Sequence, residues 1–145
     1  MKIIIDTSTI ISFLLTRGKN NLAEIINQTK QKKIKLITCK ETFIELQQSI
    51  QKEKIKKNVN YRPLNIARFI AWYKYNSIFI SLEKSTNAEN SRDMSDNIFI
   101  QLALKVNADY LLSGDKDLLV LKKIENTKIT TTEKFIKDFE ANRTN

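Results

Sequence analysis

Short runs of β-branched residues alternate with amphipathic helical segments along this chain, and this alternation limits the fold more than any other feature of the sequence. Strand-like runs cover residues 2–5, 34–38, 77–82, 109–112 and 128–130. Helical signals cover residues 10–14, 21–32, 40–57, 63–75, 95–106, 118–121 and 133–141. Because strands joined by helices form right-handed crossovers, we predict an α/β fold: a three-layer arrangement around a central, mostly parallel sheet of four to five strands.

The composition is typical of one compact domain. A chain of 145 residues, 41% of them hydrophobic, can bury a hydrophobic core without disulfide bonds or a structural zinc site. The single cysteine, Cys39, has no partner for an internal disulfide, which favours a reducing compartment. The apolar opening at residues 3–5 is too short for a signal peptide, and charged residues interrupt every later apolar run. We therefore expect a single cytoplasmic domain, residues 1–145, that does not enter a membrane.

Two scarce residue types exclude whole classes of enzyme. Histidine is absent, which excludes imidazole bases, Ser-His-Asp and Cys-His nucleophiles and His-ligated zinc. Gly18 and Gly114 are the only glycines, too few for a dinucleotide-binding fingerprint or a P-loop. The net charge of +9 favours a polyanion such as nucleic acid, although a genomic bias toward Lys, Asn and Ile codons explains the charge equally well.

Acidic residues follow the predicted strands at one edge of the sheet. Asp6 comes directly after the first strand, and Asp115 follows the fourth after one tight turn, with Asp117 two residues later. Asp93 and Asp96 stand at the start of the helix that leads into the fourth strand. Because ligands bind outside the carboxyl ends of parallel strands, these five acids are the first candidates for a functional site.

Each acid taken alone has a structural explanation as a helix cap or a turn residue. Together they need a cation, because two carboxylates about 4 Å apart repel by roughly 4 kcal/mol at an effective dielectric of 20. Oxygen ligands without His or thiolate suit Mg²⁺ or Mn²⁺, and magnesium commonly binds substrate phosphates. The expected substrate is therefore a phosphodiester. Asp109 begins its strand, so we expect it at the opposite edge in a structural role.

Four segments resemble the PIN domain family, in particular its bacterial toxin-like branch, and together they span nearly the whole chain. They are Ile-Ile-Ile-Asp-Thr at 3–7, Thr-Cys-Lys-Glu-Thr-Phe-Ile-Glu-Leu at 38–46, Arg92-Asp93 through Asp96-Asn97, and Ala108-Asp109-Tyr110 through Ser113-Gly114-Asp115-Lys116-Asp117-Leu118. The resemblance implies a PIN-like fold and an acidic quartet with two accessory acids: Asp6, Glu45, Asp96 and Asp115, then Asp93 and Asp117. Ser8 stands where the family commonly carries asparagine, and serine also donates a hydrogen bond, with shorter reach.

The activity implied by this resemblance is an Mg²⁺- or Mn²⁺-dependent endoribonuclease. Asp6, Asp96 and Asp115 would hold the metal with help from Glu45, and a metal-activated water would cut RNA, leaving 5′-phosphate and 3′-hydroxyl ends. The resemblance also implies the toxin role of a toxin–antitoxin pair, with an antitoxin protein as partner. Glu45 follows from the resemblance only, because helical periodicity places it on the polar side of its helix, where a solvated glutamate is usual.

Two other functions remain open. One is a phosphatase with an aspartyl nucleophile at Asp6, although such enzymes usually carry a second acid two residues later, where this chain has Ser8. The other is a basic RNA-binding or partner-binding module whose acids are inactive. Phospho-aspartate at Asp6 would support the first, and metal-independent RNA binding without turnover would support the second.

The helix that follows Pro63 has a second candidate surface. Its apolar stripe leaves Arg68, Trp72 and Tyr75 together on the other face. Aromatic residues beside an arginine outside the core suggest a contact surface for RNA stacking, self-association or an antitoxin. We favour a protein partner there and also expect a homodimer.

Overall fold

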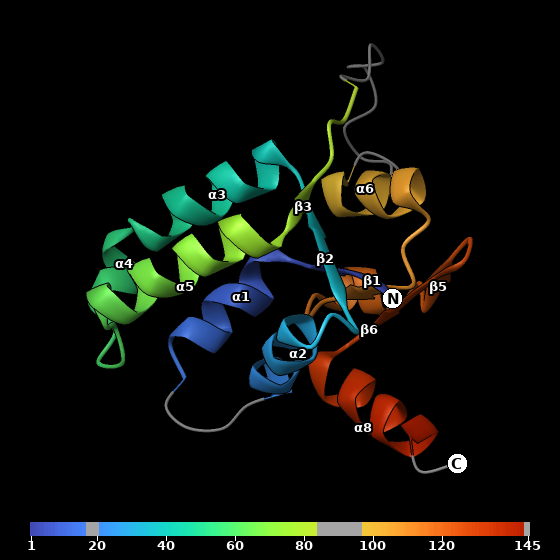
Figure 1. Ribbon diagram of the computed structural model, residues 1–145. Coiled ribbons are helices and arrows are strands. Elements are labelled where there is room, and N and C mark those ends of the chain that lie inside the picture. The colour runs from blue at the N-terminus through green and yellow to red at the C-terminus, as the bar shows by residue number, and fades with distance from the viewer. Residues whose placement is uncertain (17–20, 84–96, 144–145) are drawn as a thin grey trace.

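The computed structural model describes residues 1–16, 21–83 and 97–143, which form an α/β fold (Figure 1). Its strands are β1 (Lys2–Ile5), β2 (Lys35–Thr38), β3 (Ile78–Phe79), β4 (Tyr110–Leu112), β5 (Lys123–Ile124) and β6 (Thr127–Thr130). Its helices are α1 (Thr7–Leu14), α2 (Asn21–Lys30), α3 (Lys40–Ile50), α4 (Glu53–Lys56), α5 (Pro63–Asn76), α6 (Ile98–Val106), α7 (Lys116–Leu119) and α8 (Thr132–Arg143).

In the described part of the chain the strands form one six-stranded sheet in the order β3-β2-β1-β4-β6-β5. The first five in this order are parallel, and β5 alone runs antiparallel to its neighbour β6. The predicted α/β fold with a mostly parallel sheet is therefore confirmed. The sheet has one strand more than predicted, because β5 has only two residues and so shows no alternation in the sequence. The parallel strands bring their carboxyl ends to one edge.

Two hydrophobic clusters, one on each face of the sheet, give the molecule three layers (Figure 1). Side chains alternate along β1, so Ile3 and Ile5 pack with the cluster beneath α1, α2, α3, α5 and α8. Ile4 points to the other face, where α6 and α7 contribute Leu102 and Leu118. The central strands read as continuous apolar runs because both of their faces are buried.

The helical segment predicted at residues 40–57 is two helices, α3 and α4, separated at Gln51 and Lys52. The apolar stripe of α3 reaches the core as far as Ile50, whereas α4 has no buried residue. The core contacts that would stabilise a longer, continuous helix therefore end at Ile50. Of the strand predicted at 77–82, only Ile78–Phe79 is assigned as β3, although Ile80 N still donates to Thr38 O at 2.9 Å. The loop predicted at 85–91 and the first residues predicted for α6 lie outside the described residues.

Local signals explain where several helices begin. Asp6 and Asn97 cap α1 and α6 through side-chain oxygens, and Pro63 occupies the first turn of α5. None of the described helices combines the length and the apolar character that a membrane crossing requires.

Candidate active site

The carboxyl ends of β1, β4 and β6 bring polar residues together from three distant parts of the sequence. Asp6 N donates to Leu112 O at 3.0 Å, and Ser113 N donates to Thr130 O at 3.0 Å. These bonds continue the pairing of the strands one residue past their ends. Asp6 and Ser113, which are 107 residues apart, therefore lie side by side at the edge where ligands bind in parallel sheets.

The Asp6 carboxylate is buried, with 4% of the residue exposed. Its Oδ1 accepts hydrogen bonds from Thr9 N at 2.9 Å and from Ser8 Oγ at 3.2 Å, and its Oδ2 accepts one from Ser113 Oγ. No lysine or arginine of the described residues forms an ion pair with it. A buried carboxylate is costly unless donors compensate for lost water, and these three donors also fix its orientation.

Ser113 connects Asp6 to Asp115. The residue is 1% exposed, and while its hydroxyl donates to Asp6 the same oxygen accepts from Asp115 N at 2.9 Å. Asp115 Oδ1 in turn accepts from Asp117 N at 2.9 Å and caps α7. Ser113 lies in one of the segments that resemble the PIN domain but was not among the residues predicted for the site. Its position, one residue after a strand and two before an acid, was a signal that could have identified it.

A cleft of about 440 Å³ opens beside these residues. Hydroxyl groups line much of it, contributed by α1, the end of β4 and the start of α8. The polar lining residues are Ser8, Thr9, Ser12, Thr16, Ser113, Asp115, Thr131 and Thr132. Asp115 is exposed, and its Oδ2 makes no hydrogen bond within the described residues, so this oxygen is available to a ligand. Next to it, a Cβ on Gly114 would meet no atom within 4 Å.

The other acids predicted for the site have different positions. Glu45 is exposed on α3, and its carboxylate forms no hydrogen bond or ion pair with any described residue. Asp117 is exposed, and its backbone N–H donates a hydrogen bond to Asp115 Oδ1. Asp93 and Asp96 lie outside the described residues. Among the residues that are described, no three Asp, Glu or Cys side chains gather closely enough to hold a metal ion. The predicted acidic quartet therefore remains a prediction.

The donor set around the cleft nevertheless fits a hard divalent cation. Asp6, Asp115 and the neighbouring hydroxyls offer only oxygen, the ligand type that Mg²⁺ and Mn²⁺ prefer. In the described part of the chain neither aspartate has a basic partner. Residues from elsewhere, or water, would have to complete the coordination, as is usual for magnesium.

Asp109 lies at the opposite edge, as predicted. Its Oδ2 accepts from Lys2 N at 2.8 Å, and its own N donates to Lys2 O at 2.9 Å. These bonds join the starts of β1 and β4, so Asp109 is a structural acid and provides a natural control for Asp6.

The surface predicted on α5 is only partly exposed. Arg68 is exposed, and Tyr75 is 87% exposed. Trp72 is half-buried against the core, with its ring 6.1 Å from that of Phe69, and so does not lie outside the core as predicted. Helical side chains lean toward the preceding turn, which brings the large indole over the residue three positions earlier.

Comparison with known proteins gives two matches. Residues 2–117 match the sequence profile of the PIN domain. An uncharacterized protein of Methanocaldococcus jannaschii is 28% identical over 149 aligned residues, which cover 97% of this chain and 92% of the relative. No solved structure matches the chain significantly.

Proposed function

Because this chain belongs to the PIN domain family, we propose that it is a divalent-metal-dependent endoribonuclease. PIN domains are generally nucleases and typically bind divalent metals. The observation that carries the proposal is the link from Asp6 through the Ser113 hydroxyl to Asp115 beside an open, hydroxyl-lined cleft. The net charge of +9 supports a polyanionic substrate.

In this proposal Asp6, Asp96 and Asp115 would hold Mg²⁺ or Mn²⁺ with help from Glu45, as the family resemblance implies. The bound cation supplies charge neutralisation at the scissile phosphate and activation of water. Thr9 N, Ser8 and Ser113 keep the Asp6 carboxylate in one orientation, so this carboxylate would not have to reorient to bind a metal ion. Ser12 and Thr132 line the cleft, and their hydroxyls would donate to phosphate or ribose oxygens of a bound RNA.

The test compares Asp6→Asn with Asp109→Asn on a labelled single-stranded RNA in Mg²⁺. Asn at position 6 keeps an oxygen for the helix cap but loses the charge, so we expect cleavage to fall about a hundredfold or more. Asn at position 109 keeps an acceptor for Lys2 N, and we expect near-normal cleavage. Circular dichroism verifies that both variants are folded. Equal activity in the two variants would contradict the assignment of Asp6.

We further propose that the chain is the toxin of a toxin–antitoxin pair, a role that rests on the family resemblance. Large apolar side chains exposed on α5 and just before it support a protein contact there: Val59 is 83% exposed, Leu64 63% and Tyr75 87%. A small open reading frame beside the gene should encode a protein that binds this surface and inhibits cleavage. If its product leaves cleavage unchanged, this role is wrong.

A further inference from the structure

A groove of about 570 Å³ lies over β6, between α8 and the end of α7. Its charged lining residues are Lys122, Lys123, Lys128, Lys134 and Asp138. All four lysines are exposed, and Asp138 is the one acid among the lining residues. The lining therefore has an excess of three positive charges, which is the character of a site for an anionic ligand.

None of the four ammonium groups forms an ion pair with a carboxylate of the described residues. The ion pairs within the described residues are Lys57–Glu53 and Lys137–Glu133, and neither involves the groove. Lys123 and Lys128 lie directly opposite each other in the antiparallel pair of β5 and β6. Like charges in that position are destabilising, and a bound anion would relieve the repulsion. Lys128 Nζ lies 6.0 Å from the centre of the Tyr110 ring, which also lines the groove.

The groove leads directly to the candidate active site. Thr131, at the carboxyl end of β6, lines both the groove and the cleft beside Asp115. From Lys128 to Thr131 the chain advances about 10 Å, at roughly 3.3 Å per extended residue. A polymer whose charges repeat along its length is therefore the ligand that could occupy both sites at once.

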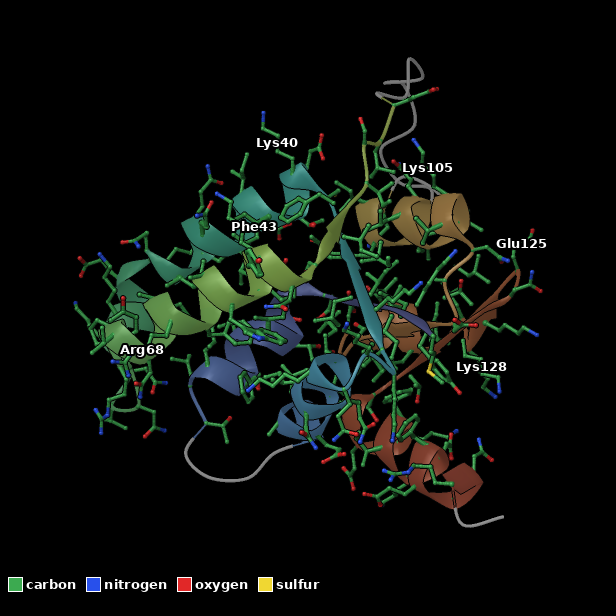
Figure 2. The ribbon with its side chains drawn as sticks, viewed as in Figure 1. Lys40, Phe43, Arg68, Lys105, Glu125 and Lys128 are labelled. Carbon is green, nitrogen blue, oxygen red and sulfur yellow. The ribbon has the colours of Figure 1, made fainter. Side chains whose placement is uncertain are left out.

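We propose that this lysine groove binds the phosphate backbone of an RNA strand and leads it into the cleft. The inference rests on the proposed nuclease function and adds to it the path of the substrate. Figure 2 places Lys128 at the opposite end of the molecule from Arg68, so the groove is separate from the candidate protein contact on α5. The lysine-rich helix α4 also lies at that far end (Figure 1) and provides a charge-matched control.

The experiment measures binding of a fluorescent 12-nucleotide single-stranded RNA in EDTA, where no cleavage is expected, by anisotropy at several salt concentrations. If Lys123→Gln/Lys128→Gln removes two phosphate contacts, affinity at 0.1 M salt should fall about 10- to 30-fold, and the slope of log K against log salt should shrink by about 1.4. Lys134→Gln, on another element, should lower the affinity about 5-fold. The control Lys54→Gln/Lys56→Gln should change it less than about 2-fold.

Equal losses in the groove and control pairs would overturn the proposal, because they would mean that only net charge matters. It would also fail if polyglutamate bound as tightly as RNA with the same dependence on the groove lysines, since the groove would then suit an acidic protein. If the wild-type protein does not cleave RNA but the groove substitutions lower its RNA affinity, the nuclease proposal is wrong and the groove is retained as an RNA-binding site. If Lys123→Gln/Lys128→Gln binds and cleaves RNA as well as Lys54→Gln/Lys56→Gln does, the groove proposal is wrong and the nuclease proposal is unaffected.

Discussion

A single hydroxyl group, that of Ser113, joins the two aspartates of the candidate site. Topology predicted Asp6 and Asp115, because each follows a strand that ends at the same edge. The part played by Ser113 depends on the pairing of β1 with β4, so its contact with Asp6 bridges 107 positions in the sequence. Local sequence also could not predict how far the Trp72 indole would reach back over Phe69.

For this single residue we predict that Ser113→Ala lowers the free energy of unfolding by about 1.5–3 kcal/mol, because the buried Asp6 carboxylate loses one of its hydrogen-bond donors. Cleavage should fall as well, and the Mg²⁺ concentration needed for half-maximal activity should rise, because Asp6 is less firmly oriented. Urea denaturation and a Mg²⁺ titration of activity measure the two effects.

The matched control is Ser8→Ala, which removes an exposed hydroxyl from the same carboxylate. Water replaces an exposed donor, so the loss of unfolding free energy should stay below about 1 kcal/mol. If the two variants are equally stable, the Ser113 bond has no special role.

Among the elements, α5 and β2 are joined by a buried tyrosine. Tyr73 on α5 is 3% exposed, and burial raises the pKa of its hydroxyl from 10.0 to about 12, although nearby Thr38 and Ser77 side chains act in the opposite direction. The stabilisation from this protonated hydroxyl is fully present below pH 10 and is lost as pH rises through 12.

We therefore predict that the unfolding free energy of the wild type falls relative to Tyr73→Phe by up to about 3 kcal/mol between pH 10 and 12. Tyr75→Phe, which alters an exposed tyrosine two residues later, should retain the wild-type pH dependence. Urea unfolding at pH 9, 10, 11 and 11.5 gives the comparison. An unchanged pH dependence in Tyr73→Phe would contradict the prediction.

The sequence predicted the ends of an element correctly where a continuous apolar pattern coincides with residues buried in the core. The strand β1 was predicted with its observed limits, Lys2–Ile5, because it is a continuous β-branched run. The two-residue strand β5 was missed, and the break between α3 and α4 was not expected, because Lys, Glu and Gln favour helix on both sides of it. In both cases tertiary contacts, which the local sequence does not report, decide the structure.

In the molecule as a whole, one edge of the sheet combines an acidic pair with the end of a basic groove. Composition predicted an excess of positive charge but could not say where it lies, because the four groove lysines come from β5, β6, α8 and the turn before β5. Only the sheet order, which places β6 beside β4, brings the groove and the aspartates together. The proposed function therefore depends on whether this edge of the sheet cleaves RNA.

The most direct measurement is the chemistry of the RNA ends that the wild-type protein produces, determined by mass spectrometry in Mg²⁺, in Mn²⁺ and in excess EDTA. A site that uses a metal and water should leave 5′-phosphate and 3′-hydroxyl ends and should lose activity in EDTA. Products with 2′,3′-cyclic phosphate, or full activity in EDTA, would contradict the account.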